Sequence, residues 1–193
     1  MPFYPNQASP LQKIKTEVGE ADLGFMSHVE VSGPLAASNV AVLASTALGV
    51  AAAEITTGIA DPDVARALRI KGNAATVAGN VVVVGTNIAD EVIDETIAAN
   101  GANAVEGAKA FKTVTSITLP AQVDPADEIS VGYNDKLGLP YLLSINTVLA
   151  VSLNAVREAT APTVTVSATA IESNTCDLDS ALDGNNVDIF LIV

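Results

Sequence analysis

The chain has little of the chemistry on which most catalytic and metal sites depend. Its 193 residues include one His, one Cys and no Trp, and only 4% of them are aromatic. A structural zinc site needs four Cys or His ligands and a His-based triad needs placed partners, so His28 and Cys176 are too few for either. Cys176 has no second thiol in the chain, so a packed core must hold the fold. We predict a protein that is not an enzyme and binds neither a cofactor nor a metal.

Positive charge is also scarce. Nine Lys and Arg stand against 22 Asp and Glu, which gives a net charge of −13 and an isoelectric point near 4.2. This charge repels nucleic acid and suits docking on a basic or mixed protein surface. The uncharged stretch over residues 35–53 is rich in Ala and interrupted by polar residues, so we expect sheet there and no membrane span. The first ten residues show no basic, apolar leader, so we expect synthesis in a cytoplasm.

The first 27 residues differ from the rest of the chain. Prolines at positions 2, 5 and 10 and glycines at positions 19 and 24 interrupt regular structure. The apolar points of the polar stretch between them suit either a short amphipathic helix or an extended segment on another subunit. We predict an N-terminal arm over residues 1–27 and one domain over residues 28–193. The candidate contact residues of the arm are Phe3, Tyr4, Leu11, Ile14 and Val18.

From His28 onward, short segments rich in Val, Ile and Thr are separated by Gly, Asn, Asp and Pro. This pattern predicts successive antiparallel strands. The fold class that we predict is all-β, an antiparallel sandwich or barrel-like domain with an extended N-terminal arm. Residues 80–84 contain four consecutive Val, too few for a helix, and are expected to be a strand buried on both faces. Asn100-Gly101, after the strand-like residues 91–98, is expected to close a hairpin.

Two further segments allow sharper predictions. Residues 111–119 alternate with period two, with Phe111, Thr115 and Ile117 on one face, so we expect one long strand and a core position for Phe111. The chain ends in the apolar run Val187–Val193, which would be an aggregation hazard as an exposed edge. We therefore expect this run to lie inside a sheet or in a subunit interface.

Three groups of polar residues are candidates for chemistry. One offers oxygen ligands of the kind that Ca²⁺ uses, although its spacing does not match an EF-hand loop and a solvated turn is the expected alternative. Its members are Asp177, Asp179, Asp183, Asp188, Asn185 and Asn186. A second group would supply the acid pair of a glycosidase: Asp90, Glu91, Asp94 and Glu95. The third is His28, which has no partner nearby in sequence and is expected to be a satisfied structural residue.

The segment from Tyr133 to Tyr141 is the most unusual in the chain. We expect a strand up to Tyr133, a polar turn over residues 134–136, and a loop whose shape is fixed by Gly and Pro. Loops that present charge beside aromatic side chains are plausible contact sites, although this one also suits a plain crossing at the end of a sandwich. The candidate partner-binding residues here are Tyr133, Lys136, Leu139 and Tyr141.

Turn and strand residues occur in a distinctive order from about residue 66 to the C-terminus. They are Gly79–Asn87, Glu95–Ile97, Asn100-Gly101, Val105–Gly107, Lys109–Pro120, Asp135–Pro140 and Val187–Val193. These segments resemble a type of structural protein found in tailed phages and prophages. Asp90 departs from the pattern, because Gly is expected in that turn.

The resemblance implies a virion component: an accessory protein that decorates or cements the major-capsid lattice on the outer surface of the head. It also implies a homotrimer, with the major capsid protein and neighbouring copies as partners, and neither nucleic acid nor membrane. The arm and the Lys136–Tyr141 loop would hold these partners. Two other classes stay open, namely a tail or adhesion module that binds glycans or a host surface, and a glycan-active enzyme with converging acids.

Overall fold

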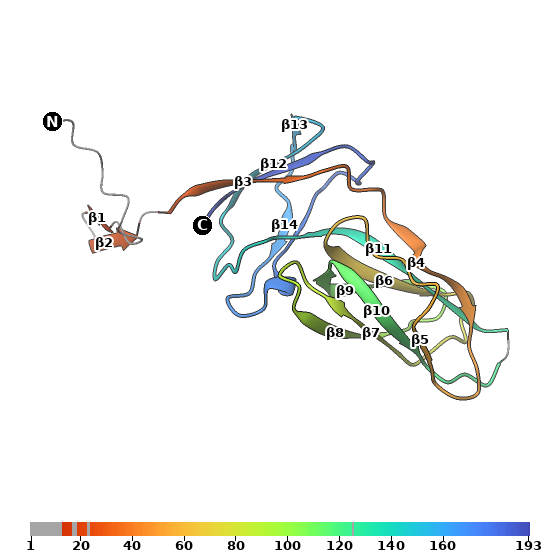
Figure 1. Ribbon diagram of the computed structural model, residues 1–193. Helices are drawn as coiled ribbons and strands as arrows, with labels where there is room; N and C mark the ends of the chain where they lie inside the picture. The colour runs from red at the N-terminus through yellow and green to blue at the C-terminus, as the bar shows by residue number, and fades with distance from the viewer. Residues whose placement is uncertain (1–12, 17–18, 23, 125) are drawn as a thin grey trace.

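The computed structural model describes residues 13–16, 19–22, 24–124 and 126–193, with side chains from residue 24 onward. Within these ranges the chain forms sixteen strands and one short 3-10 helix, η1 (Ile171–Ser173), and the strands pair with one another in antiparallel fashion (Figure 1). The strands are β1 (Lys13–Thr16), β2 (Gly19–Asp22), β3 (Met26–Val31), β4 (Ser38–Ala47), β5 (Ala53–Ile55), β6 (Arg66–Gly72), β7 (Asn80–Thr86), β8 (Val92–Ala98), β9 (Ala104–Phe111), β10 (Thr113–Leu119), β11 (Glu128–Gly138), β12 (Val148–Leu153), β13 (Val156–Arg157), β14 (Thr163–Thr165), β15 (Thr175–Asp177) and β16 (Val187–Ile192). The predicted all-β, antiparallel fold class is confirmed.

Three larger sheets and one isolated pair account for these strands. The β7 sheet has the order β5-β10-β7-β8, and the β11 sheet has the order β14-β15-β11-β6-β9, with β4 also pairing with β11. The β16 sheet has the order β13-β12-β16-β3, and β1 pairs with β2. Figure 1 shows the β16 sheet beside one end of the sandwich made by the other two sheets.

The buried apolar side chains form two cores, and β11 contributes to both. The first core lies between the β7 and β11 sheets and includes Ile129 and Val131 from the first half of β11. The second core lies between the β16 sheet and the far end of β11, where Leu137 in the strand and Leu139 just after it are fully buried. Because period-two alternation puts one side of β11 inward along its length, a single strand links the cores.

The predicted strand over residues 111–119 is in fact two strands. Phe111 is fully buried, as predicted, but it ends β9, and β10 begins at Thr113 in a different sheet. A register shift between Val114 and Ser116 then turns Val114 inward and leaves Thr115 exposed. This bulge, at which the Val114 amide donates to Asp61 Oδ1 (2.8 Å), shifts the expected alternation by one residue.

Other strand predictions have mixed outcomes. The C-terminal run is confirmed inside a sheet, because β16 lies between β12 and β3. In β7, Val81 and Val83 are fully buried but the alternate Val residues are only half-buried, so one face and not both lies in the core. Asn100-Gly101 does form a turn, with Gly101 at φ +60, but β8 and β9 on either side of it belong to different sheets. This turn therefore carries the chain between sheets and closes no hairpin.

Candidate functional site

Most arm residues predicted to bind a partner lie outside the described residues. This holds for Phe3, Tyr4, Leu11 and Val18, while Ile14 lies in β1, where only the backbone is described. The last two residues assigned to the arm, Met26 and Ser27, belong to β3. The contacts of the arm stay a prediction.

Of the four candidates near residue 137, Tyr133 and Lys136 lie in a strand and not in a turn or loop, because β11 continues to Gly138, while Leu139 and Tyr141 follow the end of that strand. Leu139 is fully buried and Tyr133 is 6% exposed, so both side chains pack inside the protein. Lys136 forms an ion pair with Glu106 (2.7 Å), and the Tyr141 hydroxyl lies 2.8 Å from Ser27 Oγ on β3. Contacts of Lys136 and Tyr141 with a partner stay a prediction.

A buried arginine explains why β11 is extended where its sequence indicates a turn. The Arg66 side chain is fully buried, and its Nε donates to the carbonyl oxygen of Asn134 (2.7 Å). Its guanidinium lies 4.2 Å from the centre of the Tyr133 ring, a cation–π contact. The pairing of β11 with β6 is irregular between Tyr133 and Leu137, which is where the guanidinium enters. Arg66 thus satisfies the backbone that the irregularity would leave unpaired.

The same arginine fixes the segments around it. Its Nη1 donates to the carbonyl of Leu35 (2.8 Å) and to Asp63 Oδ1 (3.0 Å), and its Nη2 donates to Asp135 Oδ1 (3.3 Å). Asp63 in turn accepts the Leu35 amide at 2.6 Å. Burial raises the pKa of Asp135, while the charge of Arg66 opposes that shift. The segment before β6 is therefore held against β11 and against the chain that leaves β3.

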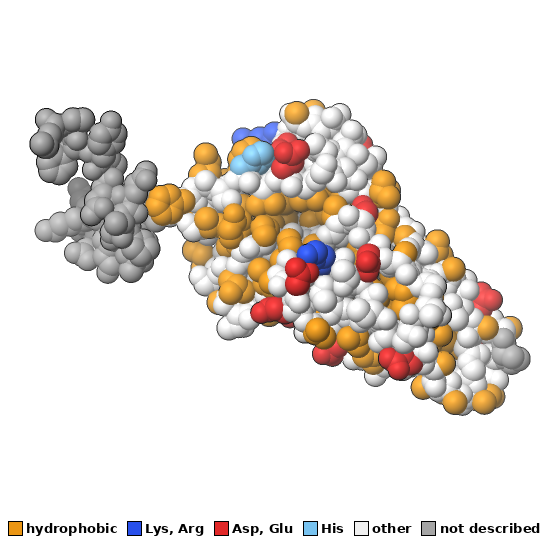
Figure 2. Space-filling view, in the orientation of Figure 1, with side chains coloured by type: hydrophobic (Ala, Val, Ile, Leu, Met, Phe, Trp, Pro, Cys, Tyr) orange, Lys and Arg blue, Asp and Glu red, His pale blue; other side chains and the backbone are white. Residues whose placement is uncertain are grey.

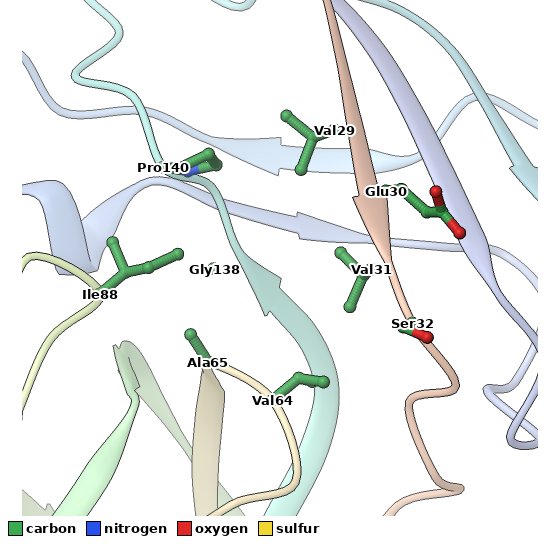
Figure 3. A pocket seen from close by; sticks show the side chains of 9 residues that line it. All are labelled: Val29, Glu30, Val31, Ser32, Val64, Ala65, Ile88, Gly138 and Pro140. Carbon is green, nitrogen blue, oxygen red and sulfur yellow. The ribbon is translucent and has the colours of Figure 1, made fainter.

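A groove of about 220 Å³ lies next to these fixed segments, between β3 and the start of β6. Its lining residues are Val29, Glu30, Val31, Ser32, Val64, Ala65, Ile88, Gly138 and Pro140. In Figure 3, Val29 and Val31 on β3 lie across one space from Ala65 and Ile88. Figure 2 shows a band of hydrophobic side chains on this face, just below the position that β3 has in Figure 1.

One edge of β3 beside the groove is unpaired within the described part of the chain, because β3 ends the order of its sheet. Phe25 and Val193 exchange two backbone hydrogen bonds of 2.9 Å, and the register continues this pairing through Val29 and Ile189. In an antiparallel pair, bonded residues alternate with residues that face the other way. Met26, His28 and Glu30 therefore direct their backbone N–H and C=O groups to the free edge.

The outer face of β3 carries charge that is already partly paired. His28 Nε2 lies 2.7 Å from Asp188 Oδ1, and its ring stacks on Phe190 at a centroid distance of 4.7 Å. His28 is a satisfied structural residue, as the sequence predicts. Glu30 accepts a hydrogen bond from Asn186 Nδ2 (2.8 Å) at a polar hollow of about 440 Å³.

Three of the four acidic residues considered for an acid pair, Asp90, Glu91 and Glu95, are held by separate donors. Within the described residues, no group of three or more His, Cys, Asp or Glu side chains is placed to hold a metal ion. Lys112 pairs with Asp90 (2.6 Å), and Asn87 donates to Glu91 (3.0 Å). Glu95 accepts the Ala108 amide (2.6 Å), and burial raises its pKa.

An exposed apolar end lies where the N-terminal segment joins the sheet. We define it as Phe25, Met26, Ile145, Ile192 and Val193, which are 64%, 73%, 67%, 39% and 44% exposed. The pairing of Met26 with Ile192 and a hydrogen bond from the Ile192 amide to the Thr147 carbonyl (3.1 Å) bring these segments together. Apolar surface gathered in this way marks sites of protein contact.

Sequence reasoning missed the groove and the role of Arg66. The groove draws its lining from four stretches that are distant in the chain, so no local motif marks it. The burial of Arg66 could have been inferred from the sequence. In β6, Arg66, Leu68 and Ile70 are alternate residues, so their side chains point to the same, inward face.

No protein-family model matches the chain, and no curated protein or solved structure matches it either. In the part of the chain that the structure describes, no helix has the length and apolarity needed to cross a membrane. In structural terms the described part of the chain is an all-β protein with two cores, an apolar groove beside an unpaired strand edge, and an exposed apolar end.

Proposed function

We propose that the protein is a non-enzymatic structural component of a virion, a decoration or cement protein that binds the major-capsid lattice and stabilises the head. The observation that carries this proposal is the exposed apolar end, where Phe25, Met26 and Ile145 are each more than 60% exposed. Surface of this kind is costly in water and is covered in an assembly.

The charge distribution supports attachment at more than one point. Residues 1–16 contain two of the nine basic residues and none of the 22 acidic ones, a net charge of +2. The remainder has seven basic and 22 acidic residues, a net charge of −15. The two parts suit surfaces of opposite sign, and several weak contacts linked in one chain bind more tightly than each alone. On this basis the partners are the major capsid protein and neighbouring copies in a homotrimer, on the outer surface of the capsid.

The test adds the purified full chain to capsids that lack it, followed by sedimentation and cryo-electron microscopy. Density at threefold or quasi-threefold lattice positions is the expected result. A folded protein that fails to bind over a wide range of salt contradicts the proposal, and binding to glycans or a host surface would indicate a tail or adhesion module.

Two variants test which surface makes the contact. Phe25→Ser with Met26→Ser should weaken capsid binding, because it removes apolar area at the exposed end. The matched control is Val50→Ser with Val123→Ser, at positions 85% and 89% exposed on the loops after β4 and before β11. A truncation that tests the N-terminal segment should remove residues 2–22 and keep Phe25. The backbone of Phe25 is hydrogen-bonded to that of Val193, and β3 begins at the next residue.

A further inference from the structure

We propose that the groove beside β3 binds the N-terminal segment of a second copy of this chain, which extends the β16 sheet by one strand antiparallel to β3. The inference rests on the proposed function in naming a neighbouring copy as the partner, and it assigns the surface that receives that copy. Four observations support it: the size of the groove, the free edge of β3, the positions of the prolines, and the charge of residues 1–16.

The size of the groove suits a side chain of a peptide better than a small molecule. At about 220 Å³ it lies below the roughly 300–1,000 Å³ of ordinary ligand pockets. Its lining is mostly aliphatic, with Val31, Ala65 and Ile88 around the same space. Aromatic side chains are the usual anchors in such pockets, and the N-terminal segment carries two adjacent ones, Phe3 and Tyr4.

The free edge and the prolines together select one register. Pro has no N–H to donate, so Pro5 must face away from β3 in an added strand. Tyr4, Asn6 and Ala8 then bond to the outward backbone groups of Glu30, His28 and Met26 in antiparallel order. Pro2 and Pro10 lie at or beyond the two ends of this stretch.

That register directs the aromatic residues to opposite faces. Residues directly opposite one another in an antiparallel pair have side chains on the same face. Phe3 lies opposite Val31 and points into the groove, whereas Tyr4 lies opposite Glu30 on the outer face. An added strand could instead run parallel to β3 and bond through the same residues. Tyr4 would then lie beside Met26, and Phe3 would lie away from the groove, which is lined by Val29 to Ser32.

Charge and length favour a second copy as the donor. Residues 1–16 have a net charge of +2, which comes from Lys13 and Lys15 in β1, whereas residues 17–193 have a net charge of −15 and include Glu30 on the rim of the groove. Within one copy, the residues just before β3 are paired with each other as β1 and β2. The twelve residues that precede β1 reach at most about 40 Å when extended, far enough to cross to a neighbour.

The register is tested by mixing two populations of the full chain, one with Tyr4→Cys and the other with Glu30→Cys, under mild oxidation and without capsids. We expect a disulfide between copies, because bonded antiparallel residues lie about 5.5 Å apart at Cα, within disulfide range. Tyr4→Cys mixed with Met26→Cys is the control out of register. The natural Cys176 does not interfere, because it is buried and burial raises its pKa to about 12.

A second measurement follows association by sedimentation equilibrium up to roughly 100 µM, well above the micromolar range of weak interfaces. Phe3→Ala should weaken association about 30-fold or more, as expected for an anchor residue. Ile88→Asp, which charges the groove, should do the same, while Val156→Asp at the opposite edge of the sheet should not.

Several results would overturn the inference. They are a wild type that stays monomeric throughout, equal cross-linking by the two cysteine pairs, and association that Phe3→Ala and Ile88→Asp leave unchanged. A disulfide that forms only when both cysteines are in one chain would show that a copy's own segment fills the groove. Capsid binding is measured separately, so a disulfide without capsid binding would refute the proposed function and leave this inference standing.

Discussion

Replacing Arg66 by Met tests whether the buried guanidinium organises the region between the two cores. The variant keeps a similar length of apolar side chain but removes every hydrogen bond from Arg66, including those to Asn134, Asp63 and Asp135. The Asn134 residue is 1% exposed, so its carbonyl would lose its donor in a place that water reaches poorly.

The magnitude follows from two opposing effects. Removing one partner of a buried ion pair costs about 3–5 kcal/mol, and an unsatisfied buried polar group costs about 1–3 kcal/mol. The side chains of Asp63 and Asp135 are 18% and 26% exposed, so both carboxylates regain part of their hydration and soften the loss. We expect the free energy of unfolding to fall by about 3–5 kcal/mol in total.

The assay is urea unfolding at neutral pH, supported by thermal unfolding. A loss of this size should lower the melting temperature by roughly 6–20 °C, at about 2–4 °C per kcal/mol for a chain of this length. Arg66→Lys should recover only part of the loss, because an ammonium group lacks the planar fork that reaches several acceptors. Arg157→Met, at an exposed position, is the matched control and should stay within about 0.5 kcal/mol of wild type. A loss below about 1 kcal/mol for Arg66→Met would show that the buried guanidinium does not organise this region.

Three further predictions concern packing, pH and thiol reactivity. Gly132→Ala should destabilise the protein by about 1–3 kcal/mol in urea unfolding, because its Cβ would collide with the Ser38 carbonyl, whereas Gly49→Ala meets nothing closer than 3.6 Å. Burial raises the pKa values of Glu95 and Asp177 above their ordinary 4.5 and 3.8, so these carboxyls bind protons more tightly in the folded state. Their stabilising effect is present below the ordinary values and is lost as pH rises through the folded pKa. The melting temperature should therefore rise as pH is lowered from 7 toward about 5, and Asp177→Asn should reduce this gain; a steady fall would contradict the assignment. Cys176 should react with a thiol reagent only on unfolding, and labelling of the native protein as fast as of the urea-unfolded chain would show that it is not buried.

The local sequence pattern predicted the structure correctly where the segment's own side chains determine it. The β-branched, apolar run at the C-terminus has to be paired and covered in any fold, and β16 is central in its sheet. Phe111, one of few large apolar side chains, lies in the core for the same reason.

Local pattern failed where a distant group changed the outcome. The expected alternation through Thr115 was wrong because a bulge forms where Asp61 accepts the Val114 amide. The polar residues after Tyr133 indicated a turn, but Arg66, 68 residues earlier in the chain than Asn134, satisfies the backbone there and keeps β11 extended.

Composition and period-two alternation are enough to specify the all-β class, the burial of the last strand and the charge contrast between residues 1–16 and the remainder. The presence of two cores, the link between them through β11, and the groove lined by Val31, Ala65 and Ile88 depend instead on contacts between distant segments. Such contacts form because strand pairing and buried hydrogen bonds join segments tens of residues apart, and their partners are selected by the complementarity of whole surfaces rather than by neighbouring residues.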